Sequence, residues 1–131
     1  MKITKGYWIN YWEPQHQLYN DNFIRSSCLR FDNDGISRVY HFKKDGSVDT
    51  SNCERNTHFD IKWKYSNNDS IFKYVGKNGS MKHKVLKLKN DTIILKFYEK
   101  EDVYNKGDIV YFVKYSPKSV PIYVEGTVVR F

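Results

Sequence analysis

The stretch from Phe23 to Phe42 constrains the fold more than any other part of the chain. In it, two runs of alternating apolar and polar residues flank the sequence Asp32-Asn33-Asp34-Gly35. Such alternation is typical of a strand with one buried face, and an Asp-Gly pair between two such runs is typical of a tight hairpin turn. The stretch therefore predicts a β-hairpin whose turn lies at residues 32–35.

Shorter runs of the same kind, each bounded by turn residues, continue along the 131-residue chain. Aromatic residues make up 17% of the chain and alanine is absent, which favours strands over helices. The alternation changes phase near Lys84–Val85, where we expect a β-bulge. Cys53 is expected in a loop over residues 51–56. The other predicted strands cover residues 6–12, 47–50, 57–65, 71–75, 81–88, 92–98 and 108–115.

An up-and-down order of these strands leaves two exposed edges unless the sheet closes on itself. We therefore predict an all-β fold, an antiparallel up-and-down β-barrel of about eight strands with room for one small ligand. The length fits a single domain over residues 1–131. Pro117 ends the last strong strand, and residues 116–131 are expected to form a C-terminal tail or an extra edge strand.

Four short motifs follow one another at a characteristic spacing. Gly6-Tyr7-Trp8 opens the first strand with the pattern G-x-W, and Leu29 to Gly35 reads apolar-x-Phe-x-x-Asp-Gly. Trp63-Lys64-Tyr65 and the turn from Leu88 to Ile93 come later. In their order and spacing, these motifs resemble those of the small bacterial lipocalin-like domains of the calycin group.

The resemblance implies a barrel in which Trp8 packs across the closed end, beneath a basic side chain from the last strand. Both Lys114 and Arg130 are candidates for that basic side chain. The resemblance also implies binding of small apolar molecules, although some members of the group are protein inhibitors. The residues after Pro117 are not covered by it.

Two arginines, Arg25 and Arg38, fall among the apolar residues of the predicted hairpin. A buried guanidinium is costly unless it is paired or solvated, and its planar fork fits two oxygens of a carboxylate or phosphate. Tyr40 lies two residues beyond Arg38, on the same face. These three residues form a predicted clamp for an anionic ligand. The alternative is that both arginines reach water at the strand ends.

The face on which Arg38 lies depends on the length of the turn. A two- or four-residue turn places Arg38 with Leu29 and Phe31, whereas a three-residue turn with a bulge places it beside Cys28 and Arg30.

Trp63 and Tyr111 complete the predicted ligand-binding set, because a buried indole or phenol needs a hydrogen-bond partner. The chain has no recognisable catalytic or nucleotide-binding motif, and its four histidines lack the spacing of a metal site. We therefore expect no catalytic residue, no metal and no cofactor. The aromatic residues that either line a cavity or form an ordinary core are Tyr40, Phe59, Trp63, Tyr65, Tyr74, Phe97 and Tyr111.

The net charge of +7 comes mainly from lysines that alternate with apolar residues, as on solvated strand faces. These lysines are not concentrated in one strand pair, and no ribonucleoprotein-type motif is present, so the sequence does not favour nucleic acid as a partner. Cys28 and Cys53 match no metal motif, and a disulfide and two free thiols both stay open.

We predict a non-enzymatic protein that holds a small anionic or amphiphilic molecule in its barrel. The alternative is a protein-interaction module, such as an immunity or inhibitor protein that blocks a toxin or defence enzyme. Such a module would bind its target through the loops Glu13–Asn22 and Glu99–Gly107. The first of these loops is also a candidate lid. An interior filled by side chains would favour this alternative. The N-terminal residues lack an apolar stretch for a signal peptide or membrane span, so a cytoplasmic location is expected, or a periplasmic one if a leader was removed.

Overall fold

The computed structural model describes residues 2–13, 24–54, 62–76, 79–98, 106–118 and 120–131. Within this part of the chain there are eleven strands and one 3-10 helix, η1 (Lys2–Thr4), so the prediction of an all-β fold is confirmed. Nine strands form one sheet and two form a second. The strands are β1 (Trp8–Glu13), β2 (Ser27–Phe31), β3 (Ser37–Phe42), β4 (Val48–Glu54), β5 (Lys62–Ser66), β6 (Ile71–Gly76), β7 (Gly79–Leu88), β8 (Thr92–Phe97), β9 (Ile109–Lys114), β10 (Ile122–Val124) and β11 (Thr127–Val129).

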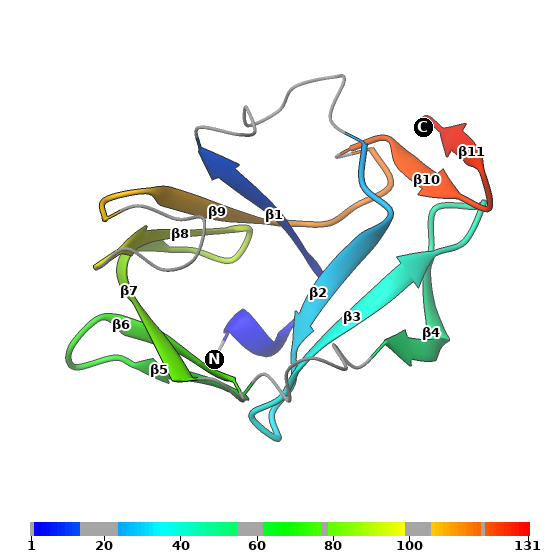
Figure 1. Cartoon of the computed structure of the whole chain (residues 1–131). Helices are drawn as coiled ribbons and strands as arrows, with labels where there is room; N and C mark the ends of the chain where they lie inside the picture. Colours follow the sequence, from blue (N-terminus) through cyan, green and yellow to red (C-terminus); the bar gives the residue numbers. More distant parts are fainter. Residues whose placement is uncertain (1, 14–23, 55–61, 77–78, 99–105, 119) are drawn as a thin grey trace.

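The large sheet has the order β4-β3-β2-β1-β9-β8-β7-β6-β5, and all of its neighbouring strands are antiparallel (Figure 1). Apart from β4 and β5, strands that follow one another in sequence are neighbours in space, as the up-and-down prediction requires. The first and the ninth strands are also neighbours, and they pair from Trp8 opposite Lys114 to Glu13 opposite Ile109. The two ends of the meander therefore meet at β1 and β9.

The strands β4 and β5 are the two edges of this sheet, and no ladder joins them in the described residues. An isolated bridge and a backbone hydrogen bond link β5 to the residues just before β3. Ile36 forms an isolated bridge with Lys62, and the amide of Trp63 donates a hydrogen bond to the carbonyl of Gly35 over 2.9 Å. The sheet has nine strands rather than about eight, and its closure into a barrel stays a prediction.

The turn between β2 and β3 has three residues and a bulge. The amide of Asp32 donates to the carbonyl of Ile36 over 3.1 Å, and the amide of Gly35 donates to the carbonyl of Asp32 over 3.0 Å. Gly35 has a φ of 81°, the left-handed conformation that this type of turn requires at its last position. The predicted turn at residues 32–35 is confirmed in position.

This turn fixes the register of the hairpin and so determines the face on which Arg38 lies, which the sequence left open. Arg38 lies directly opposite Arg30, and Tyr40 lies opposite Cys28. Partners that face each other across a ladder lie on the same side of the sheet, so Arg38 shares its face with Arg30 and Cys28 rather than with Phe31.

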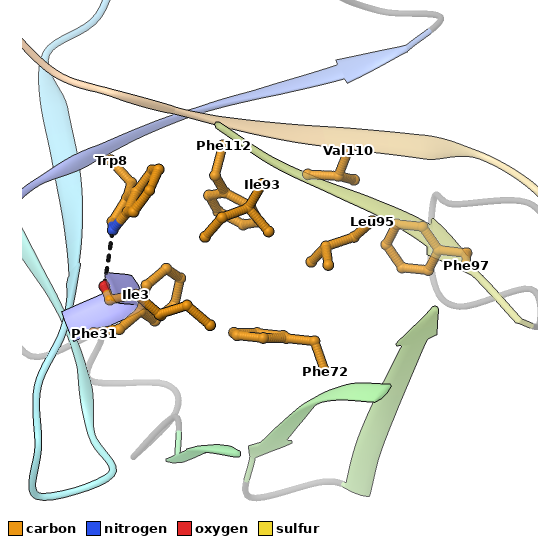
Figure 2. Packing of buried hydrophobic residues seen from close by; sticks show 9 residues of the cluster. All are labelled: Ile3, Trp8, Phe31, Phe72, Ile93, Leu95, Phe97, Val110 and Phe112. Atoms are coloured by element: carbon orange, nitrogen blue, oxygen red, sulfur yellow. Dashed lines mark hydrogen bonds between the residues drawn. The ribbon is translucent and has the colours of Figure 1, made fainter. Parts of the chain in front are cut away.

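The sheet packs its inner face, the one that carries Trp8 and Phe31, around an apolar cluster that we call the inner core (Figure 2). Phe31 contacts the rings of Trp63, Phe72 and Phe112 edge-on at centroid distances of 5.4–5.7 Å. Such edge-to-face contacts add to the stabilisation from apolar burial. The inner core consists of Ile3, Trp8, Phe31, Phe72, Ile93, Leu95, Phe97, Val110 and Phe112.

One end of the inner core is covered by η1. The indole Nε1 of Trp8 donates a hydrogen bond to the carbonyl of Ile3 over 3.0 Å (Figure 2). The ammonium of Lys114, on β9, lies 5.1 Å from the centre of the Trp8 ring, within range of a cation–π interaction. Of the two basic residues considered from the sequence, Lys114 is therefore the one that lies over Trp8.

The opposite face of β1, β2 and β3 is also covered. The strands β10 and β11 form a separate hairpin whose Ile122 and Val124 pack on this outer face, and β10 also pairs with Arg25 through a parallel bridge. The C-terminal segment is thus a docked hairpin, not an edge strand of the large sheet. The resulting outer core consists of Ile9, Tyr11, Cys28, Tyr40, Phe42, Val120, Ile122 and Val124.

Some local predictions need correction. Cys53 lies in β4, not in a loop, because β4 extends to Glu54 after a shift of register between Tyr40 and His41. The predicted bulge in β7 is confirmed, with the register shifting between Val85 and Lys87. Phe59, the candidate lid apart from Glu13, and most of the loop from residue 99 to 107 lie outside the described residues.

The two cysteines lie on β2 and β4, the strands on either side of β3. Tyr40 pairs with Cys28 on one side and with Cys53 on the other, so the two cysteine Cα atoms are two strand spacings apart, about 10 Å. That separation exceeds the reach of a disulfide. Cys28 is a buried free thiol, and burial raises its pKa to about 12, which keeps it unreactive.

Candidate functional site

The structure places Arg38 at the tip of the β2–β3 hairpin. Its guanidinium donates to Asp32 over 2.6 Å and to Asp34 over 2.8 Å. The hydrogen bonds to Asp34 and Asp32 raise the pKa of Arg38 above its usual value. Its neighbour Arg30 lies 2.8 Å from the other carboxylate oxygen of Asp32. The carboxylates of Asp32 and Asp34 therefore already bind the Arg38 guanidinium, which the sequence analysis had assigned to an anionic ligand.

Tyr40 belongs to the outer core and Tyr111 packs against it, so neither lies on the inner face of the sheet. The ring of Tyr40 packs edge-on against Tyr7 at 5.4 Å, and Tyr111 lies on β9 opposite Tyr11. Both faces of these strands are apolar because the C-terminal hairpin covers the outer one. Alternation in the sequence cannot distinguish such a strand from one that lines a cavity.

Trp63 points to the interior, as predicted, and takes part in the inner core. Its indole stacks on Phe72 at 6.2 Å, and its Nε1 donates a hydrogen bond to the carbonyl of Asp32 over 3.0 Å. This bond satisfies the polar group of the ring and ties β5 to the β2–β3 turn. The observed contacts of Trp63 are those of a core residue.

Arg25 is the predicted site residue with the most unusual surroundings. The strands β1 and β2 pair through Trp8 and Leu29 and then diverge (Figure 1). Arg25 bridges the two diverging strands, because its Nη2 donates a 2.6 Å hydrogen bond to the side-chain oxygen of Asn10. Burial lowers the pKa of its guanidinium, and the nearby Tyr11 partly offsets that effect.

The five predicted residues therefore do not form one site. Arg25 and Arg38 lie near opposite ends of the same hairpin, roughly 17 Å apart for five residues of strand. Trp63 packs against the inner core, whereas Tyr40 is in the outer core and Tyr111 packs against it. The predicted clamp of Arg25, Arg38 and Tyr40 is not assembled by the fold.

His83 is a buried residue that the sequence analysis did not single out. It is 2% exposed and lies edge-on to Phe97 at 4.4 Å and to Tyr74 at 5.8 Å. Burial lowers its pKa to about 4, although a hydrogen-bond contact with the carbonyl of Phe72 acts in the opposite direction. The sequence feature that could have indicated burial is the position of His83 between Met81 and Val85, on the apolar face of β7.

The outward side of the C-terminal hairpin carries exposed apolar side chains. Tyr123 is 47% exposed and lies directly opposite Val128, which is 43% exposed. Ile24, also exposed, is next to this pair because the amide of Tyr123 donates to the carbonyl of Arg25 over 3.0 Å. We call Ile24, Tyr123 and Val128 the hairpin patch.

Comparisons with protein-family models, curated proteins and solved structures found no match to this chain. In the described part of the chain, no His, Cys, Asp or Glu residues gather in groups of three or more that could hold a metal ion. None of the described helical residues forms a segment with the length and apolarity needed to cross a membrane.

Proposed function

We propose that the protein is a non-enzymatic interaction module on a lipocalin-like barrel, and that it binds a partner protein through its outer surface. The observation that carries this proposal is the aromatic packing of the interior. Side chains of the inner core follow one another from Trp8 and Ile3 at one end to Phe97 at the other (Figure 2). This continuous packing of apolar side chains supports the protein-interaction alternative over a ligand held inside the sheet.

The lipocalin-like part of the proposal is supported by the closed end. The Trp8 ring with the Lys114 ammonium above it is consistent with the arrangement that the resemblance implies, and η1 lies at the same end. This arrangement involves Gly6, where an added Cβ would approach the Lys114 side chain to 3.1 Å. The Gly6-Tyr7-Trp8 motif is therefore consistent with the packing of Lys114 against Gly6 and Trp8.

The hairpin patch is the surface that best suits a protein partner. Tyrosine is enriched at the energetic centres of protein interfaces, because it buries a large area at a low entropic cost. Here an exposed tyrosine stands beside exposed aliphatic side chains on a hairpin whose other side is anchored in the outer core. An immunity or inhibitor protein is one class of module that acts in this way.

Native mass spectrometry of the protein isolated from its own host tests the proposal. We expect a stoichiometric protein partner that is lost in Val128→Lys and retained in Val75→Lys, a matched control because Val75 is a strand valine that is 40% exposed. Retention of the partner by Val128→Lys would contradict the role of the hairpin patch. Isolation of the protein with a small molecule alone would contradict the proposal as a whole.

A small anionic ligand is a second candidate, and Arg25 is the observation that favours it. Its guanidinium lies at diverging strands beside Asn10 and Tyr11, where a carboxylate would meet one cation and two polar groups. If native mass spectrometry reveals a bound small acid, Arg25→Lys should weaken its retention, since lysine lacks the planar fork that grips two oxygens. Unchanged retention in Arg25→Lys would exclude this site.

A further inference from the structure

The outer face of β5, β6, β7 and β8 is covered with lysine side chains. In these four strands the aromatic residues point to the inner core and the lysines point away from it, as the pairing registers show. Six of the seven lysines are exposed and Lys73 is partly exposed. We call this surface the lysine face; its lysines are Lys62, Lys64, Lys73, Lys82, Lys84, Lys87 and Lys96.

The register of the sheet places several of these lysines directly opposite one another. Lys64 faces Lys73 across β5 and β6, and Lys73 faces Lys82 across β6 and β7. Lys84 faces Lys96 across β7 and β8. Neighbouring strands are about 4.8 Å apart, so these lysines form one row of three residues and one row of two.

No carboxylate on the four strands themselves balances these rows. The sequences of β5 to β8 contain no Asp or Glu. The described acidic residues of the connecting turns, Asp69 and Asp91, accept hydrogen bonds from Ser66 and Thr92 at the ends of the strands. Like charges directly opposite each other destabilise a sheet, so this arrangement lowers the stability of the fold.

We propose that the lysine face binds the phosphate backbone of nucleic acid. The proposal concerns a surface and a partner other than those proposed above, and it stands or falls independently. Rows of ammonium groups complement the regular negative charge of a phosphodiester chain, and release of its counterions drives such binding. The cost in stability is removed when phosphates lie between the lysines.

The chemistry of the face favours a nucleic acid backbone over other acidic partners. Protein interfaces are depleted in lysine at their centres, whereas lysine serves well as a point charge for phosphate. A membrane surface is less suited, because interfacial binding needs a broad apolar side that enters the lipid. The aromatic side chains Trp63, Tyr65, Phe72, Tyr74 and Phe97 lie on the core side, so the lysines rather than stacked bases provide most contacts, and binding is independent of base sequence.

This inference reverses a conclusion from the sequence, for a definite reason. The sequence did not favour nucleic acid because the lysines are spread over many short segments. The fold brings those segments side by side and turns all seven lysines to one face. Cross-strand register, which only the folded sheet provides, creates the concentration of charge.

Fluorescence anisotropy with a labelled DNA duplex of mixed sequence tests the proposal. We expect a Kd of about 10⁻⁴–10⁻⁶ M at physiological salt, and a logarithmic salt slope of about −5 if roughly six phosphates are contacted. The double variant Lys73→Gln/Lys82→Gln should reduce the slope by about two, since each phosphate contact contributes about 0.9. The matched control Lys5→Gln/Lys118→Gln removes the same charge from exposed positions elsewhere and should leave the slope unchanged.

Both double variants should fold, because each replaces side chains that are exposed or partly exposed, and circular dichroism checks this. A single-stranded probe should bind with a shallower slope, as its lower charge density requires. Equal losses in the two double variants would overturn the proposal, because net charge alone would then explain binding. It would also be overturned if phosphatidylserine vesicles or polyglutamate bound through the lysine face and the duplex did not.

Discussion

The two halves of the large sheet have the same inner face and different outer faces. In β1 to β3, both faces are apolar, because the C-terminal hairpin covers the outer side with Ile122 and Val124. In β5 to β8, the inner face is equally aromatic, but the outer side carries the lysine face. One sheet thus contains a half that is buried on both sides and a half that is buried on one side.

The charges of the two halves differ in the same way. At the tip of the β2–β3 hairpin, Arg30 and Arg38 lie opposite each other and share Asp32, and Asp34 completes the group. In the other half, lysines that lie opposite each other have no acidic residue among them on their strands. Like-charge pairs are compensated within the fold in the first half, whereas in the second half we infer compensation by a bound anion.

The largest effect should come from removing the cover of the first half. Ile122 is fully buried, so Ile122→Ala should cost about 2–5 kcal/mol of unfolding free energy through lost burial and a cavity. Val128→Ala, on the exposed side of the same hairpin, should change stability by less than about 0.5 kcal/mol. Urea denaturation measures both, and equally small losses would show that the hairpin does not stabilise the sheet.

The second half should be sensitive to acid through its inner core. The pKa of His83 is about 4 in the folded protein and 6.5 in its unperturbed form, so the unfolded state binds more protons between these values. Stability from neutral His83 is complete above pH 6.5 and should fall by about 3 kcal/mol as the pH drops to about 4. His83→Gln should flatten this part of the stability profile, and a wild-type profile without this decline would contradict the assignment.

A smaller effect is expected at the end of the inner core that η1 covers, where β9 joins the two halves. Lys114→Met keeps most of the side-chain volume over Trp8 and removes the cation–π interaction, which should cost about 1 kcal/mol. Lys118→Met, at an exposed position just beyond β9, should leave the midpoint of thermal unfolding unchanged. If the two variants were equally stable, the Trp8–Lys114 contact would make no measurable contribution to the stability of the fold.

The sequence predicted what depends on neighbours along the chain. Asp34-Gly35 identified a turn whose glycine has a positive φ, and the phase change in β7 identified a bulge. These features follow from local backbone chemistry. The face of Arg38 was not determined in advance, because one residue more or less in the turn moves every side chain of β3 to the other side.

The candidate site was less predictable because it depends on contacts between distant segments. Tyr40 and Tyr111 were assigned to a cavity, and nothing local indicates that residues 120–129 would cover them. Likewise, Lys64 and Lys82 are far apart in sequence and come together only through the registers of β6. His83 was not singled out, although it occupies an apolar position on an alternating strand.

The most direct test of the difference between the halves is the stability of Lys73→Glu at low and high salt. Lys73 lies between Lys64 and Lys82, so the variant converts two repulsive pairs into two attractive ones. In about 20 mM NaCl, where the Debye length is about 20 Å, the variant should be more stable than the wild type by about 1 kcal/mol. In about 500 mM NaCl, where the Debye length is about 4 Å, the difference in unfolding free energy between the variant and the wild type should become smaller. A variant that is no more stable than the wild type at low salt would contradict the account.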